Sequence, residues 1–246
     1  MPLNVVVTGA NAGLGLELCK QLTARGDVVY ASCRAPTAEL EAVGVKKIIH
    51  DVDVTADDAG DRLARALDGV RVDAVINNAG GLGSNPGRSW DEQFEDQKFA
   101  TLDFRVMQRA FEVNTLGPIR VTKALTPKLK ESKGKVLIVT SLMGSISDNG
   151  SGGAMAYRCA KAAVNMAAAT MASELREAGV AVGLVHPGML KTNFGGGTPP
   201  ANMMKWFKPV EGGGRGVLMA LDALTMETTG SFVHGNYGEG LKPCPW

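Results

Sequence analysis

Short runs of apolar and β-branched residues alternate along the chain with longer stretches in which apolar residues recur every three or four positions. The short runs are typical of strands that are buried on both faces, and the longer stretches are typical of amphipathic helices. The pattern predicts strands at residues 4–9, 28–33, 46–54, 72–80, 135–141, 180–188 and 230–235, and helices at residues 14–26, 57–69, 104–132 and 156–179.

This alternation predicts parallel strands joined by right-handed helical crossovers. The expected fold class is therefore α/β: a Rossmann-type, doubly wound parallel sheet of about seven strands, flanked by helices on both faces. No linker or internal repeat divides the chain, so residues 1–246 are expected to form a single domain. Residues 193–214 are irregular and rich in Gly, Pro and Met, which favours a substrate loop at this position.

Composition and charge narrow the range of partners. The chain has 246 residues, 45% of them hydrophobic, and a formal net charge of +1, so a nucleic-acid partner is not expected. No apolar run is long enough to span a membrane, and the start lacks the pattern of a signal peptide. The four cysteines are scattered without metal-ligand spacing. We therefore expect reduced thiols, no metal site and a cytoplasmic location.

A glycine loop follows the first predicted strand and opens the first predicted helix. Gly9, Gly13 and Gly15 let backbone N–H groups approach a pyrophosphate, and the helix N-terminus adds partial positive charge. Asn11 and Leu14 belong to the same loop. The loop predicts a dinucleotide cofactor.

The end of the second predicted strand bears on which dinucleotide binds. NAD sites carry Asp or Glu there, but this strand ends without an acid and Arg34 follows at once. A guanidinium group can pair with a 2′-phosphate through two hydrogen bonds. Arg34 therefore favours NADP(H) over NAD(H), although it could also be an ordinary surface arginine.

Tyr157 and Lys161 lie four residues apart in the predicted helix 156–179, so their side chains share one face. A free tyrosine has a pKa of ~10, and a nearby ammonium group lowers that value by ~1–3 units. Such a tyrosine could exchange protons with a substrate near neutral pH. The spacing alone is more typical of an amphipathic helix in which a lysine lies beside a tyrosine, so other residues must decide.

These features and several others occur in the order known from one family. The chain resembles the short-chain dehydrogenase/reductases over almost its whole length, and within them the NADPH-dependent carbonyl reductases of the sniffer and C-factor type. The matching residues are Gly9, Gly13 and Gly15 of the glycine loop, the pair Asp53 and Val54, Asn78, Ala79 and Gly80 of an Asn-Asn-Ala-Gly sequence, Asn114, Ser141, Tyr157 and Lys161, and Pro187, Gly188 and Thr192.

The resemblance implies that Asn114, Ser141, Tyr157 and Lys161 are catalytic. Tyr157 would be the general acid or base, Ser141 would hydrogen-bond the carbonyl oxygen, and Asn114 would hold a water linked to Lys161. Lys161 would also bind the nicotinamide ribose. With the glycine loop and Arg34, the expected cofactor-binding set is Gly9, Asn11, Gly13, Leu14, Gly15, Arg34, Asp53, Val54, Asn78, Ala79, Gly80, Tyr157, Lys161, Pro187, Gly188 and Thr192.

Ser145 is a second serine that could match the catalytic position. Ser141 directly ends the predicted strand 135–141, at the carboxyl edge where ligands bind in doubly wound sheets, whereas Ser145 lies farther into the following loop. We therefore choose Ser141.

Three functions fit these residues. The first is an NADP(H)-dependent carbonyl reductase that transfers hydride to a ketone or aldehyde. The second is an alcohol or hydroxysteroid dehydrogenase that works oxidatively, and the third is a non-catalytic NADP(H)-binding regulatory protein. The expected partner is a small-molecule carbonyl or alcohol substrate. The resemblance also implies a homodimer or homotetramer.

Overall fold

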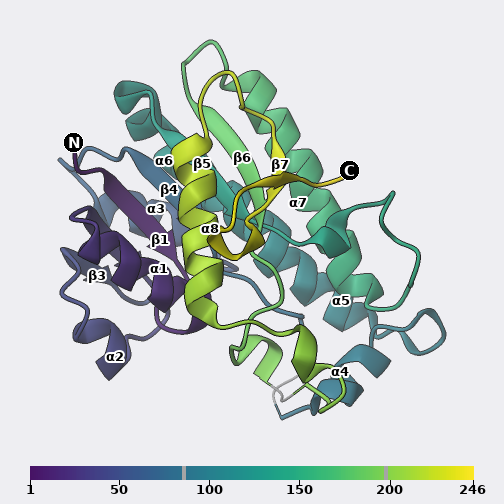
Figure 1. Ribbon diagram of the computed structural model, residues 1–246. Helices are drawn as coiled ribbons and strands as arrows, with labels where there is room; N and C mark the ends of the chain where they lie inside the picture. Colours follow the sequence, from purple (N-terminus) through teal and green to yellow (C-terminus); the bar gives the residue numbers. More distant parts are fainter. Residues whose placement is uncertain (85–86, 197–198) are drawn as a thin grey trace.

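The computed structural model describes residues 1–84, 87–196 and 199–246. A single eight-stranded sheet runs through the middle of the molecule in the order β3-β2-β1-β4-β5-β6-β7-β8, with helices on both faces (Figure 1). Adjacent strands are parallel except for the pair β7 and β8. The strands are β1 Asn4–Thr8, β2 Val28–Ser32, β3 Lys47–Ile49, β4 Ala74–Asn77, β5 Lys135–Val139, β6 Ala181–His186, β7 Phe232–His234 and β8 Lys242–Pro243.

The doubly wound parallel α/β fold is confirmed, with two differences in its strands. The strand expected at residues 46–54 ends at Ile49, and the chain then turns through Asp51, whose φ is +57°. The eighth strand was not predicted, because Lys242–Pro243 is an exposed two-residue pair without an apolar pattern. It pairs antiparallel with β7 at the edge of the sheet.

The helices differ more from the predictions. The helix expected at 104–132 is interrupted by a π-helical turn at Glu112–Leu116, and three helices, α2, α4 and α8, were not predicted. Short 3₁₀ turns occur at Phe99–Thr101, Leu142–Gly144, Phe194–Gly196, Met204–Trp206 and Asn236–Gly238. The α-helices are α1 Gly13–Ala24, α2 Ala38–Glu41, α3 Ala59–Ala66, α4 Trp90–Glu95, α5 Phe104–Phe111, α6 Gly117–Ser132, α7 Met155–Glu174 and α8 Val210–Ala223.

The segment expected as a loop at 193–214 ends in a helix. Residues from Val210 onward belong to α8, and residues 197–198 lie outside the described part of the chain. The first turns of α8 contain three glycines, and glycine disfavours helices, so the sequence predicted a loop here. They are needed for close packing: a Cβ on Gly213 would lie 2.4 Å from Leu190 Cδ1, and one on Gly214 would lie 2.6 Å from Gln21 Nε2.

Two hydrophobic layers bury the faces of the sheet. The layer beneath α1 and α8 contains Val5 and Val7 of β1, whereas Val6 points into the layer beneath α3, α6 and α7. Alternate side chains of one strand thus enter opposite layers, as expected for a doubly covered sheet. Because β1, β4, β5 and β6 are parallel neighbours, their carboxyl ends lie at one edge of the sheet, where the expected site residues lie.

Within the described ranges, no helix combines the length and the apolar character needed to cross a bilayer. Nor do the described residues contain a group of three or more His, Cys, Asp or Glu side chains placed to hold a metal ion. All four cysteines are free, and Cys19 is fully buried in the core beneath α1.

Candidate active site

The glycine loop is built for close approach of backbone to an anion. Gly9 has φ +65°, and a Cβ there would lie 2.9 Å from the Cα of Ala79. Gly15 tolerates no side chain either, since its Cβ would lie 2.1 Å from the Gly9 carbonyl oxygen. α1 begins at Gly13 with no side-chain cap and no acidic residue in its first turn. The positive end of α1 therefore fits a pyrophosphate group.

The end of β4 is tied directly to this loop. The Thr8 hydroxyl accepts hydrogen bonds from the backbone N–H groups of Asn78 and Ala79, each at 3.1 Å. The Asn78 side chain donates to the Thr8 carbonyl at 2.9 Å. Gly80 follows, and a Cβ there would lie 2.9 Å from Asn114 Oδ1 and 3.8 Å from Lys161 Nζ. The Asn-Asn-Ala-Gly segment thus joins the glycine loop to the expected catalytic residues.

The residues expected at the adenine end follow β2 and β3, and they differ in exposure. Arg34 is exposed directly after β2. The Asp53 carboxylate accepts from the backbone N–H of Thr55 at 2.9 Å, and Val54 is buried against Gly117. Asn11 is held by the Thr37 hydroxyl, which donates to the Asn11 carbonyl at 3.0 Å.

Tyr157 and Lys161 lie side by side in the first two turns of α7. Tyr157 is buried, and Ser141 lies near enough to its phenol to influence the phenol's pKa. The Lys161 Nζ donates to the Val139 carbonyl at 3.0 Å and lies 5.6 Å from the centroid of the Tyr157 ring.

The electrostatics of this pair differ from the prediction. Burial raises the pKa of Tyr157 above its usual value, and the hydrogen bond with Ser141 only partly opposes that effect. Burial also lowers the pKa of Lys161 to about 7, so its ammonium group is only partly charged at neutral pH. The expected lowering of the Tyr157 pKa by Lys161 is therefore wrong for the protein without a bound cofactor.

The structure distinguishes the two serines. Ser141 lies just beyond β5, caps the 3₁₀ turn Leu142–Gly144 and contacts Tyr157. The Ser145 hydroxyl accepts from the backbone N–H of Asp148 at 3.1 Å and lies 3.4 Å from the Ser147 hydroxyl. Ser145 thus stabilises the loop that precedes α7, and Ser141 is the serine next to Tyr157.

Asn114 lies fully buried in the π-helical turn between α5 and α6. Its side chain donates to the carbonyls of Gly81 at 2.7 Å and Ala110 at 2.8 Å, and accepts from the Gly81 N–H at 3.2 Å. Asn114 therefore fixes the segment after β4 beside Lys161. Its expected role in holding a water stays a prediction.

Pro187, Gly188 and Thr192 follow β6 at the same edge of the sheet. Thr192 lies against Gly13, whose Cβ would be 3.3 Å from the Thr192 Cβ. Gly188 has φ +91°, and the Tyr237 ring occupies the space of its missing side chain. The Tyr237 hydroxyl accepts from the Met189 N–H at 3.2 Å.

Tyr237 and Phe194 also belong to the site. Tyr237 has a strained φ of +53° and supports the segment after Pro187, but no sequence motif identifies it. Phe194 packs its ring edge-on against Tyr157 with 5.9 Å between the centroids. Phe194 lies in the irregular stretch 193–214, which the sequence favours as a substrate loop.

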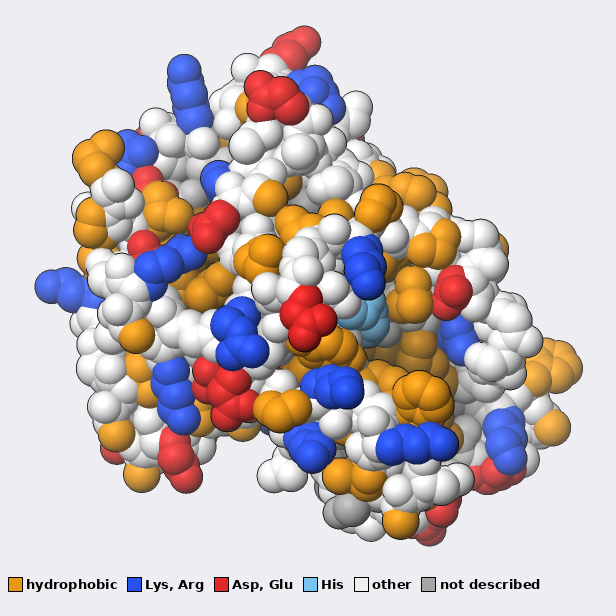
Figure 2. All heavy atoms as spheres, viewed as in Figure 1, with side chains coloured by type: hydrophobic (Ala, Val, Ile, Leu, Met, Phe, Trp, Pro, Cys, Tyr) orange, Lys and Arg blue, Asp and Glu red, His pale blue; other side chains and the backbone are white. Residues whose placement is uncertain are grey.

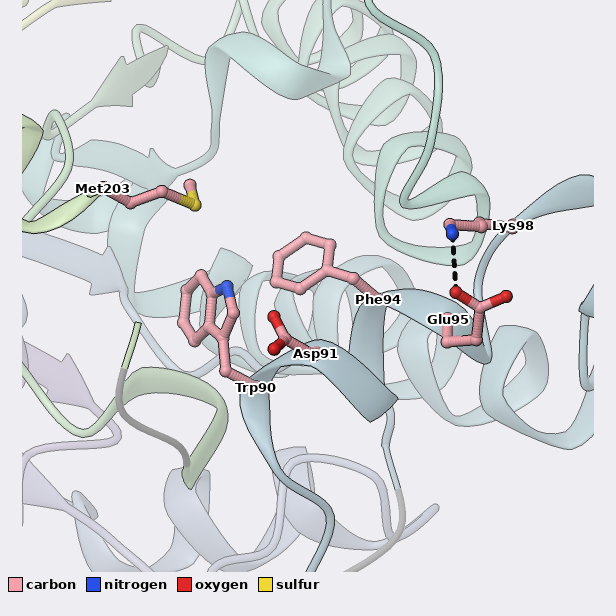
Figure 3. Close-up of a pocket in the computed structure, with 6 residues that line it drawn as sticks. All are labelled: Trp90, Asp91, Phe94, Glu95, Lys98 and Met203. Carbon is pink, nitrogen blue, oxygen red and sulfur yellow. Dashed lines mark ion pairs between the residues drawn. The ribbon is translucent and has the colours of Figure 1, made fainter. Parts of the chain in front are cut away.

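A shallow hollow of about 370 Å³ lies on the outer side of α4 (Figure 3). Trp90 and Phe94 form one wall and Met203, from the expected substrate loop, faces them. Asp91 and an ion pair between Glu95 and Lys98 complete it. The four expected catalytic residues do not line this hollow. Figure 2 shows hydrophobic side chains gathered around a depression in the face of the molecule, with Lys and Arg side chains at its rim.

A glycine loop at the positive end of α1 and a buried group of Ser141, Tyr157 and Lys161 at the same sheet edge define a dinucleotide-dependent oxidoreductase. The model of the short chain dehydrogenase family matches residues 3–201. The chain belongs to the short-chain dehydrogenase family, whose members use a nicotinamide cofactor.

Individual proteins support the same assignment. The 1-hydroxy-2-glutathionyl-2-methyl-3-butene dehydrogenase of Rhodococcus sp. (strain AD45) is 37% identical over 94% of this chain and 96% of the relative. An NADPH-bound carbonyl reductase from chicken fatty liver is 27% identical with a TM-score of 0.79, covering 100% of this chain and 99% of that one. The carbonyl reductase Sniffer of D. melanogaster, at 24% identity and a TM-score of 0.83, covers 100% of both chains and shows the shared fold.

Proposed function

We propose that this protein is an NADP(H)-dependent carbonyl reductase, acting on a largely apolar ketone or aldehyde. The observation that carries the proposal is the placement of Tyr157 and Lys161 side by side in α7, next to Ser141, at the sheet edge that holds the glycine loop. The NADPH bound to the similar chicken enzyme supports the choice of cofactor.

The bound cofactor would supply the hydride, and the residues of the chain would position the carbonyl group and provide the proton. Tyr157 is protonated at neutral pH, since a tyrosine has a pKa of ~10 and burial does not lower it, so it can donate a proton to the carbonyl oxygen. Ser141 would stabilise the negative charge that develops on that oxygen. Lys161, with a pKa of about 7, can gain or lose a proton near neutral pH.

A second candidate is an alcohol dehydrogenase that works in the oxidative direction. The name of the Rhodococcus relative, a dehydrogenase of a hydroxylated glutathione conjugate, favours it. The raised pKa of Tyr157 favours reduction, because a general base must be deprotonated before it accepts a proton. A non-catalytic NADP(H)-binding protein is a weaker candidate, since Asn114, Ser141, Tyr157 and Lys161 are all present.

The test is the absorbance of the reduced nicotinamide. The purified protein would be given NADPH or NADH with a panel of aldehydes, α-diketones, aryl ketones and quinones. Carbonyl-dependent loss of NADPH that is much slower with NADH is the expected result. Turnover only of alcohols with the oxidised cofactor would support the second candidate. NADPH binding without any turnover would support the non-catalytic one.

The choice between the two serines gives a separate prediction. Ser141→Ala should lower kcat by about 10²- to 10³-fold, the usual effect of removing one donor to a developing oxyanion. Ser145→Ala is the matched control, because Ser145 contacts loop residues and is expected to leave kcat within about threefold of wild type. An equal loss in both variants would contradict the assignment of Ser141.

Arg34 gives a prediction about the cofactor. Arg34→Asp should weaken NADPH binding by about 10- to 100-fold, because a charge-assisted pair with the 2′-phosphate is lost. NADH, which lacks that phosphate, should bind as well as before. Dissociation constants from the fluorescence of the reduced nicotinamide would check this, and an equal loss for both cofactors would mean that Arg34 does not contact the phosphate.

We further propose that the protein assembles as a homodimer or homotetramer. Phe104 and Phe111 of α5 and Met166 of α7 are exposed hydrophobic side chains on the two helices that pack against each other. Apolar side chains on neighbouring elements support a subunit interface. Light scattering at low micromolar concentration would test it, and a monomeric mass would contradict it.

A further inference from the structure

The helix that carries Tyr157 begins without a cap of its own. Ala154, at the N-cap position of α7, has φ +47° and offers no side-chain acceptor. The first N–H groups of a helix have no acceptor within the helix and need one from elsewhere. Acceptors for the first turn of α7 must therefore come from another part of the fold.

Gln97 supplies two of these acceptors. Its backbone carbonyl accepts from the Met155 N–H at 3.0 Å, and its side-chain Oε1 accepts from the Tyr157 N–H at 3.0 Å. The Gln97 side chain is fully buried, and its Nε2 donates to the Gln93 carbonyl at 3.2 Å. Both ends of the amide are thus bonded, which fixes the acceptor beneath Tyr157.

The segment that ends in Gln97 contacts two parts of the molecule. Trp90 and Phe94 of α4 line the hollow opposite Met203 (Figure 3). Gln93 and Gln97 are buried, and Gln97, just beyond the end of α4, meets the start of α7. The same short segment therefore contacts both the hollow and the backbone of the expected proton donor.

We propose that Gln97 is a positioning residue for Tyr157, and that α4 connects the hollow to the start of the catalytic helix. The proposal rests on the proposed role of Tyr157 as proton donor. Gln97 acts through the Tyr157 backbone: it fixes the first turn of α7 and so places the phenol hydroxyl against Ser141. A displacement of about 1 Å at a reacting group can reduce a rate by ~100-fold.

Gln97→Met tests the proposal, because methionine keeps the volume and removes the acceptor. We expect kcat to fall by about 10- to 100-fold with an NADPH dissociation constant within about twofold of wild type. Gln97→Glu keeps an oxygen for the Tyr157 N–H and, while its buried carboxyl is protonated, an O–H for the Gln93 carbonyl, so it should restore most of kcat below the pKa of that carboxyl. Gln93→Met is the matched control: Gln93 is equally buried in α4, but its side chain bonds the Arg88 carbonyl and not α7.

A second measurement does not depend on activity. Amide hydrogen exchange at Tyr157 should be about 10- to 100-fold faster in Gln97→Met than in Gln93→Met, because the Tyr157 N–H loses its acceptor. The Met155 N–H bonds the backbone carbonyl of Gln97, which both variants keep, so its exchange is the internal reference. If the wild-type protein turns over no carbonyl or alcohol, the proposed function fails, but the exchange rates still decide whether Gln97 fixes the start of α7.

Three results would overturn the proposal. The first is a Gln97→Met variant with kcat within about twofold of wild type. The second is a loss of kcat in Gln93→Met as large as that in Gln97→Met, which would show a general effect of weakening α4. The third is a Gln97→Glu variant as slow as Gln97→Met, which would show that the acceptor oxygen is not what positions Tyr157.

Discussion

Tyr157→Phe is expected to bind NADPH normally and to lose carbonyl reduction by about 10²- to 10⁴-fold, the usual contribution of a positioned general acid. The substitution removes one oxygen and keeps the ring, so the packing of Tyr157 against Phe194 is retained. The loss should appear in kcat, because the proton is needed in the transition state. Steady-state kinetics with the best carbonyl of the panel, together with NADPH titration, would measure both quantities.

Tyr30→Phe is the matched control, since Tyr30 is also buried but lies in β2 within the layer beneath α3. It should leave kcat within about threefold of wild type. Retention of more than about a tenth of the wild-type kcat in Tyr157→Phe would remove Tyr157 from the proton-transfer step and with it the proposed mechanism.

The parts of the fold that could be predicted are those with local signals. Buried strands such as β1, β2 and β5 are continuous apolar runs, and their alternation with helices fixes parallel pairing. Tyr157, Lys161, Ser141 and Asn114 follow from motifs whose order matches the family. The structure brings these four residues and the glycine loop to one edge of the sheet.

Features that depend on distant contacts escaped prediction. The glycines of α8 predicted a loop, because nothing in the sequence shows that Leu190 and Gln21 pack against α8 and require small residues in it. Gln97 caps a helix that begins 58 positions later, and Tyr237 fills the space above Gly188. A motif search finds neither residue, because each acts through a contact formed only in the folded chain.

The charge state of the site escaped prediction for a related reason. Sequence spacing places Lys161 next to Tyr157, which suggests an ammonium group that lowers the pKa of the phenol. Burial acts on both groups and favours the neutral form of each. The degree of burial is a property of the packed site, so proximity alone gave the wrong direction for Tyr157.

Lys161→Met is expected to abolish turnover and to stabilise the cofactor-free protein at neutral and lower pH. The activity loss should be of the order of 10²-fold or more, because the proposed proton supply to Tyr157 and the expected contact with the nicotinamide ribose are both removed. The gain in stability follows from burial: an ammonium group in this position costs free energy that a methionine side chain does not.

The difference in unfolding free energy between Lys161→Met and the wild type should change with pH in one direction. The pKa of Lys161 is lowered from 10.5 to about 7 in the folded protein, so between these values the unfolded chain binds more protons. The unfolding free energy of the wild type therefore rises with pH through this window, relative to a variant without the lysine. The advantage of Lys161→Met should be largest below pH ~7, of the order of 5 kcal/mol, and should vanish by pH ~10.5.

Urea unfolding of the cofactor-free wild type and Lys161→Met at several pH values between 6 and 10 would measure this difference. Lys123→Met, which removes an exposed lysine of α6, is the control and should show no comparable trend. A Lys161→Met protein that is less stable than wild type at pH 6 would mean that the hydrogen bond from Lys161 to the Val139 carbonyl outweighs the cost of burial. In that case burial would not lower the pKa of Lys161, its ammonium group would be charged at neutral pH, and the sequence-based expectation that it lowers the pKa of Tyr157 would stand.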